Sequence, residues 1–478
     1  MKKASDNPTS SKKANVKRPI YANSVLFNFI CSLYFNVFST AGGNRDDDCQ
    51  SLRRLTARLL YGTSTQGQRT ISRRSNLFDL RKMMNAPSPH DDEEVHGGEE
   101  VFLDEGDIIQ EYTVDEEDLP DADEEEGSDT EEVIDGEDDS THTFTGHTGE
   151  LYTVACSPTD ATLVATGGGD DRGFLWKINQ GDWAFELQGH QDSVSSLAFS
   201  TDGQLLASGG FDGLVKVWDI SKGDIKCTLD GPSGGIEWVR WHPRGHLILA
   251  GSEDSTVWMW NADRSAYLNM FSGHGSTVTC GDFTPDGKVI CTGSDDATMR
   301  IWNPKTGENI HVVRGHPYHN EGLTCLAISS DSALALTGSK DGSVHAVNIS
   351  TGKVVSSLSA HSDSIECIGF AVSSPLAATG GMDKKLIIWD MQHSSPRCTC
   401  DHEDGVASLM WLPGSRHIAT GCVDGKVRLW DSLSGECVKI FSGHSDAIQS
   451  VAVSANGDFL VSVSLDGTAR AFEIAEFR

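Results

Sequence analysis

Residues 189–219 read GHQDSVSSLAFSTDGQLLASGGFDGLVKVWD, and this stretch decides the fold. Three short runs within it, 194–199, 205–208 and 215–218, have the alternation and composition of half-buried strands. Asp-Gly pairs separate these runs, and such pairs favour tight turns. A fourth run at 226–229 follows before the next unit begins. Four short antiparallel strands in one compact unit predict a blade of a β-propeller.

The same unit recurs along the chain at a nearly constant spacing. Its marker is an aspartate in a turn, then a strand and usually a tryptophan, and successive markers are 42, 42, 42, 45, 42, 41 and 42 residues apart. The eight markers are Asp170, Asp212, Asp254, Asp296, Asp341, Asp383, Asp424 and Asp466. A period in the low forties predicts an all-β propeller of eight blades, or of seven if one degenerate unit is extra. The last unit supplies only three strands, so we expect segment 141–145 to complete it and remove its open edge.

Each unit also repeats a set of polar residues around the marker. The set in residues 189–219 is His190, Ser208, Asp212 and Trp218, and it resembles the WD-repeat family, whose members hydrogen-bond these residues inside each blade. The resemblance gives a structural role to the eight marker aspartates and to His147, His190, His274, His444, Trp218, Trp302, Trp389 and Trp430. Because the set recurs in blade after blade, it does not indicate a catalytic triad, and we expect no enzyme.

Some units depart from this pattern. The fifth ends in Val347-Asn348 instead of Trp-Asp, and its upstream loop reads His316-Pro-Tyr-His319. We expect blades without the tryptophan to lose part of the polar network and to depend more on apolar packing. The two loop histidines lack a cysteine or carboxylate partner, so they favour a capped loop over a metal site.

The charge of the chain is strongly acidic and unevenly distributed. The 478 residues include 38 Lys or Arg and 70 Asp or Glu, a net charge of −32. Residues 84–140 alone contain 26 Asp or Glu and no Lys or Arg. This field repels phosphate backbones and attracts basic proteins. We therefore expect a basic protein or a Lys/Arg-rich peptide as partner, no direct nucleic acid and no membrane, and a monomeric chain.

The twelve cysteines are scattered and form no CxxC pair, and Cys398-Thr-Cys400 is too tight for an ordinary zinc site. Several, such as Cys156 and Cys280, stand where blade strands need a small apolar residue. The sequence thus predicts reduced, mostly buried thiols. It predicts no metal and no cofactor.

The chain divides into three segments. Residues 84–140 are too acidic to bury a core and are predicted to be a disordered tail, and residues 141–478 form the propeller. Residues 1–83 carry 15 Lys or Arg and 5 Asp or Glu, and three interpretations stay open for them. They lie outside the working protein, which then begins at Met83 or Met84, or they are an organelle transit peptide, or an apolar run at 20–38 is an anchor.

Loops at the propeller rim supply the candidate binding residues. Propellers bind partners mainly through the loops that enter the inner strands and the loops that carry the turn aspartates. Those loops and the adjoining strand residues give Glu150, Asp192, Glu237, Trp238, Glu253, Asp295, Glu321, Asp363, Glu366, Asp404 and Asp446. We expect these acids to converge on one face and grip a basic segment, with Trp238 as an aromatic contact.

Three stretches carry a closer resemblance. Residues 166–176 (TGGGDDRGFLW), 238–243 (WVRWHP) and 249–260 (LAGSEDSTVWMW) resemble the angio-associated migratory cell protein family. That family has an acidic N-terminal tail and includes a fungal member that acts as a chaperone of a basic large-subunit ribosomal protein, so the resemblance implies a role in ribosome assembly. Animal members are linked to migration and signalling, which leaves a signalling scaffold as an alternative. A ubiquitin-ligase adaptor is a third, although no Trp-Asp-x-Arg follows a blade. We expect a cytoplasmic protein, with the nucleus as a second location.

Overall fold

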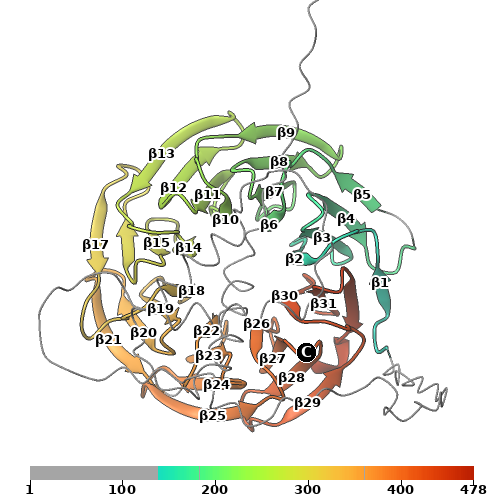
Figure 1. Cartoon of the computed structure of the whole chain (residues 1–478). Coiled ribbons are helices and arrows are strands. Elements are labelled where there is room, and N and C mark those ends of the chain that lie inside the picture. The colour runs from blue at the N-terminus through green and yellow to red at the C-terminus, as the bar shows by residue number, and fades with distance from the viewer. Residues whose placement is uncertain (1–137, 182–183, 360) are drawn as a thin grey trace, which may run out of the picture. The chain divides into compact units, whose positions relative to one another are not determined.

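The computed structural model describes residues 138–478, except 182–183 and 360. In this part of the chain, 32 strands form eight four-stranded antiparallel sheets around a common axis (Figure 1). The predicted eight-bladed propeller is confirmed. The predictions for residues 1–83 and for most of the acidic tail lie outside the described residues. Within the described ranges, the one helix is the short 3-10 turn Ala475–Phe477, and none has the length and apolarity to cross a membrane.

Each blade runs from an inner strand at the axis to an outer strand at the perimeter. The inner strands are β2 (Leu151–Cys156), β6 (Val194–Phe199), β10 (Ile236–Trp241), β14 (Cys280–Phe283), β18 (Leu323–Ile328), β22 (Ile365–Phe370), β26 (Val406–Trp411) and β30 (Ile448–Val453). The second strands are β3 (Leu163–Gly168), β7 (Leu205–Gly210), β11 (Leu247–Ser252), β15 (Ile290–Gly293), β19 (Leu334–Ser339), β23 (Leu376–Gly381), β27 (His417–Cys422) and β31 (Phe459–Ser464).

The third and outer strands complete the blades. The third strands are β4 (Gly173–Lys177), β8 (Val215–Asp219), β12 (Thr256–Asn261), β16 (Met299–Trp302), β20 (Val344–Asn348), β24 (Lys385–Asp390), β28 (Val427–Asp431) and β32 (Ala469–Glu473). The outer strands are β5 (Ala184–Leu187), β9 (Asp224–Leu229), β13 (Ala266–Ser272), β17 (Asn309–Val313), β21 (Lys353–Leu358), β25 (Ser395–Asp401), β29 (Cys437–Phe441) and β1 (His142–Phe144).

The core lies between neighbouring blades. Second strands such as β3 and β7 are buried along their whole length, whereas outer strands such as β29 are largely exposed. Close packing of blades needs glycine at some strand ends. A Cβ on Gly209 would lie 2.6 Å from a methyl carbon of Ile236 in the next blade, so a larger residue there would push the blades apart.

The ring closes through its first described strand. β1 pairs with β32 in the register His142↔Ala471 and Phe144↔Ala469, and Figure 1 shows the teal β1 against the red final blade. The Phe144 ring also stacks on Trp176 of the first blade, with ring centroids 5.1 Å apart. This short segment therefore joins the last blade to the first and covers the free edge of β32.

Candidate functional site

The strand order places two sets of loops on one face of the propeller. An inner strand begins on the same face on which the antiparallel second strand ends. The loop into each inner strand and the turn after each second strand therefore share this face, which we call the upper face. Both the repeated His–Asp sets and the rim candidates lie on the upper face or just inside it. Arg240 and Asp282 continue the polar lining deeper, on β10 and β14, where their side chains are 45% and 46% exposed and pair at 3.8 Å.

The second blade shows what the repeated polar residues do. His190 contacts Asp212 through Nδ1 at 3.1 Å and Ser208 through Nε2 at 2.8 Å, and the Trp218 indole N–H donates to the same hydroxyl at 3.0 Å. Burial alone would raise the pKa of Asp212, but the hydrogen bond and the charge of His190 lower it on balance. These groups are satisfied by one another, so they hold the turn and are not available for chemistry.

Blade five keeps its network by a substitution that the sequence did not reveal. His319 is the blade histidine, since its Nε2 lies 2.8 Å from the Thr337 hydroxyl and its Nδ1 lies 2.6 Å from Ser343. Tyr318 replaces the missing tryptophan and donates its O–H to Thr337 at 3.0 Å. The expected loss of the polar network in this blade is therefore wrong, because a loop residue supplies the donor that the third strand lacks.

Blades three, four and six supply a cluster of acids at the upper face, and blade five supplies a lysine among them. We call it the acidic arc, and it comprises Glu237, Glu253, Asp295, Asp363 and Glu366. Lys340 forms an ion pair with Asp295, and its charge also acts on Glu237 and Glu366. One cation thus lies among five carboxyl groups, which leaves a surplus of negative charge for a ligand.

Two members of the arc are carboxyl groups with strongly raised pKa values. Burial, and then the charges of Glu253 and Asp295, raise the pKa of Glu237 to about 8. Burial raises the pKa of Glu366 to about 7, and its side chain is only 7% exposed with a 2.7 Å hydrogen bond from Ser364. Near neutral pH Glu237 is therefore mostly protonated and Glu366 is partly protonated, and a nearby cation would favour the ionised form of both.

These two glutamates stand at positions where other blades have a hydroxyl that bonds to the next blade. Each lies 17 residues before the turn aspartate of its blade, a place that Ser195, Thr279 and Thr324 take in other blades. Those three hydroxyls donate to backbone carbonyls of the next blade, as Thr279 does to Leu323 at 2.6 Å. In the described part of the chain, neither Glu237 nor Glu366 makes this blade-to-blade bond, and Glu366 instead accepts a hydrogen bond from Ser364 of its own blade.

This comparison gives a stability prediction for Glu366→Thr. Because the folded-state pKa of about 7 lies above the ordinary value of 4.5, the unfolded chain loses this proton first. The free energy of unfolding of the wild type should therefore fall as pH rises from 4.5 to 7 and stay low above that. The threonine variant does not lose stability in this way. Its free energy of unfolding, relative to that of the wild type, should therefore rise between pH 5 and pH 8 by on the order of 2 kcal/mol.

Urea unfolding of both proteins at the two pH values measures the effect. The exposed Glu321→Thr variant is the control and should show no growth of the difference with pH. An advantage of Glu366→Thr that is equal at pH 5 and pH 8 would contradict the prediction.

Trp238 does not lie where the sequence predicted. Its side chain is 4% exposed, packs against Gly251 and Gly281, and donates its indole N–H to the carbonyl of Val278 at 2.9 Å. The expected aromatic contact is therefore corrected: Trp238 bonds blade three to blade four. It supplies there the hydrogen bond to the next blade that the neighbouring Glu237 does not make.

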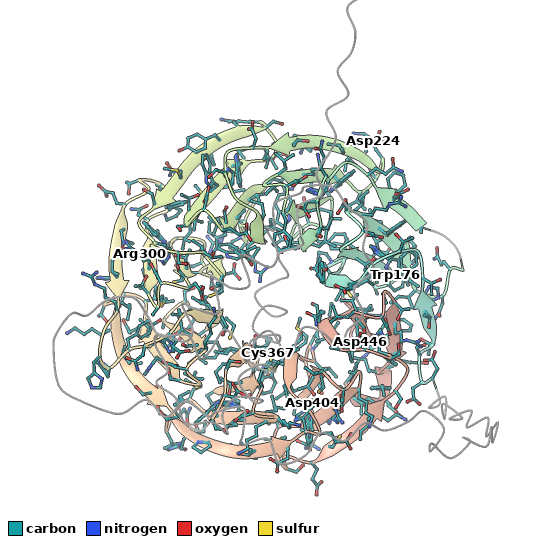
Figure 2. All side chains as sticks on the ribbon, viewed as in Figure 1. Trp176, Asp224, Arg300, Cys367, Asp404 and Asp446 are labelled. Atoms are coloured by element: carbon teal, nitrogen blue, oxygen red, sulfur yellow. The ribbon has the colours of Figure 1, made fainter. Side chains whose placement is uncertain are left out.

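The side chains of the other candidate acids make no hydrogen bond or ion pair with the arc in the described part of the chain. Glu150 accepts the Tyr152 hydroxyl at 3.0 Å, and together with Asp192 it raises the pKa of that phenol beyond the effect of burial. Asp404 lies 3.5 Å from Lys384, while Asp446 is exposed; Figure 2 shows both on the neighbouring blades seven and eight. Glu321 is also exposed. The acids thus share one face, and the five of the arc are linked there through Lys340 or through the charge of a neighbouring member.

Sequence reasoning missed Lys340, the cation inside the arc. A usable signal was present, since Glu253, Asp295 and Lys340 all stand directly before the turn aspartates of three consecutive blades. Residues at one position of adjacent blades come close together around the axis. An acid and a base in that register therefore predict an ion pair between blades, which the structure shows for Asp295 and Lys340.

Comparison with known proteins agrees with this architecture. The family model described as WD domain, G-beta repeat matches residues 138–177, 181–219, 223–261, 265–303, 307–346, 352–390, 394–431 and 435–473. The angio-associated migratory cell proteins of Homo sapiens and of Canis lupus familiaris are each 36% identical to the chain over 354 residues, which cover 71% of this chain and 81% of the relative.

Solved structures show the same fold. Sqt1 of Chaetomium thermophilum, bound to the N-terminus of the ribosomal protein L10, superposes with a TM-score of 0.66 at 25% identity and covers 71% of this chain and all of its own. Sqt1 of Saccharomyces cerevisiae gives a TM-score of 0.65 at 22% identity with the same share of this chain. The chain belongs to the WD-repeat family and, within it, to the family of the angio-associated migratory cell protein.

Proposed function

We propose that this protein is a non-enzymatic chaperone that binds the basic N-terminal segment of a large-subunit ribosomal protein and shields it until assembly. The observation that carries the proposal is the complex of the similar Sqt1 propeller with the N-terminus of ribosomal protein L10. The acidic arc supports it independently, because five carboxyl groups around one lysine suit a chain rich in Lys and Arg.

The arc favours a cationic ligand for a further reason. Near neutral pH Glu237 is mostly protonated and Glu366 partly protonated, because burial and neighbouring carboxylates disfavour their charge. An incoming ammonium or guanidinium group would stabilise the carboxylates and release protons. A neutral peptide offers no such compensation, so the arc would select for positive charge.

Binding of a synthetic peptide tests this function. The peptide is the N-terminal segment of ribosomal protein L10 from the same organism, and its Kd is measured by isothermal titration at rising salt. We expect tight binding at low salt, weakening of at least about tenfold as salt rises to physiological strength and beyond, and proton release on binding.

A matched peptide in which glutamine replaces every Lys and Arg is the control and should not bind. Equal affinity for both peptides, or affinity independent of salt, would contradict a site that recognises positive charge. The shielding role has its own measurement: full-length L10 should stay soluble when this protein is co-expressed and should aggregate without it.

A further inference from the structure

Two cysteines lie side by side on the perimeter, away from the acidic arc. Cys398 and Cys400 are two residues apart on β25, where they pair with Ile388 and Leu386 of β24, so both side chains point to the same face of the blade. That face meets blade seven at the turn Ser432–Glu436. Both sulfurs also lie next to the same turn residue, Gly435, so the two thiols are close neighbours.

The turn of blade seven is shaped around these thiols. Gly435 has a φ of +76°, and a Cβ at this position would lie 3.2 Å from the Cys398 sulfur and 4.0 Å from the Cys400 sulfur. The Gly435 carbonyl accepts from the Cys400 thiol at 3.5 Å, and the Ser432 carbonyl lies 4.0 Å from the Cys398 sulfur. Glycine suits this position because of its positive φ, and because a Cβ would crowd the Cys398 side chain.

The two thiols differ in exposure. Cys400 is 2% exposed, whereas Cys398 is partly open to solvent. The neighbouring thiol of Cys400, followed by the charge of Arg397, lowers the pKa of Cys398, and the same neighbourhood together with burial raises the pKa of Cys400. One thiol is thus accessible and activated, and its neighbour is protected and holds its proton.

We propose that Cys398 and Cys400 form a reactive dithiol that takes hydroperoxides as oxidants and closes to a reversible disulfide. The Cys398 thiolate attacks the peroxide oxygen, the O–O bond breaks, and an alkoxide or hydroxide leaves and takes up a proton. The sulfenic acid formed is then attacked by the Cys400 sulfur; an S–S bond forms and water leaves. The two thiols lose two electrons in total, and the hydroperoxide is reduced to an alcohol and water.

The position on β25 makes such a bridge reversible. Residues two apart on a strand have Cα atoms about 6.6 Å apart, near the upper limit for a disulfide, so closing it bends the strand. β25 is an outer strand with one free edge, and its register with β24 already shifts at Arg397. A strained bridge of this kind has a higher reduction potential than a structural disulfide and reopens with ordinary thiols.

Cys437 provides an internal control. Among the described cysteines it is the exposed one, and it lies on the neighbouring β29. Partial burial of its thiol raises its pKa. Despite its greater exposure, we expect iodoacetamide to modify Cys437 at pH 7 at least about fivefold more slowly than Cys398 in the full chain. Faster modification of Cys437 would overturn the proposal.

Peptide mapping tests the bridge directly. Trypsin cleaves after Arg397 and Arg416, and peptide 398–416 contains only these two cysteines, while Cys437 lies in peptide 429–439. After treatment with hydrogen peroxide and alkylation of free thiols, peptide 398–416 should appear unalkylated and two hydrogens lighter, and dithiothreitol should restore the alkylated form.

Serine variants separate the roles. Cys437→Ser should form the bridge like the wild type, and Cys400→Ser should accumulate a sulfenic acid at Cys398 that dimedone traps. Cys398→Ser should leave Cys400 unoxidised. A disulfide to Cys437 in place of the Cys398–Cys400 bridge, or oxidation of Cys398 no faster than that of Cys437, would overturn the proposal. Because these thiols lie outside the arc, failure here leaves the binding of a basic peptide unaffected.

Discussion

Replacing Phe144 by alanine is expected to lower the free energy of unfolding by about 3–5 kcal/mol. This one side chain, 9% exposed, stacks on Trp176 at 5.1 Å and meets Phe174 edge-on at 5.5 Å, although its own strand pairs with the last blade. Its loss leaves a cavity at the junction of the first and last blades. The melting temperature should fall by roughly 5 °C for a domain of this size.

Differential scanning calorimetry measures this shift. The control is Phe185→Ala on β5, an aromatic truncation at a side chain that is 37% exposed, and it should change the melting temperature much less. Removing residues 1–146 takes away β1 altogether and should abolish the cooperative transition or cause aggregation through the uncovered edge of β32. Equal stabilities of the Phe144 and Phe185 variants would show that β1 does not hold the ring closed.

Replacing Glu237 and Glu366 together by lysine is expected to weaken binding of the basic L10 segment by at least about a hundredfold. Two lysines would replace the most deeply placed carboxyl groups of the arc and meet Lys340, so a cluster that attracts cations would repel them. Isothermal titration gives the Kd, and the salt dependence of binding should also become weaker.

Two further variants, one expected to tighten binding and one expected to leave it unchanged, make this test specific. Lys340→Met frees Asp295 from its ion pair and should tighten binding by about threefold to tenfold at low salt. Asp224→Lys changes an exposed acid at the start of β9, on the outer perimeter in Figure 2, and should leave the affinity unchanged. Circular dichroism confirms folding, and the milder Glu366→Gln serves if the double reversal unfolds. Unchanged affinity in the folded double variant would contradict binding at the arc.

Much of the fold follows from spacing alone. The constant distance between turn aspartates predicted the number of blades, because each turn marks one compact four-stranded unit. The replacement of the blade-five tryptophan by Tyr318 could not be predicted from this spacing. Tyr318 lies near Thr337 only because the loop folds back over the strand, and no local pattern encodes that approach.

The site was only partly predictable, for a related reason. Which loops share a face follows from antiparallel order, so the acids could be assigned to one rim. Whether a side chain then points to solvent or into a blade junction depends on its neighbours, as Trp238 shows. Its burial follows from Gly251 and Gly281, whose missing side chains open the space that the indole fills.

The buried hydroxyl at the centre of most blade networks has a consequence for recognising distant repeats. Seven of the eight blades place Ser or Thr four residues before the turn aspartate, whereas only three end in Trp-Asp. In blade five the acceptor Thr337 persists while the donor changes from indole to phenol. A search profile that weights this hydroxyl above the tryptophan should therefore detect degenerate blades that a search for Trp-Asp misses. It should also count the blades of divergent propellers more accurately.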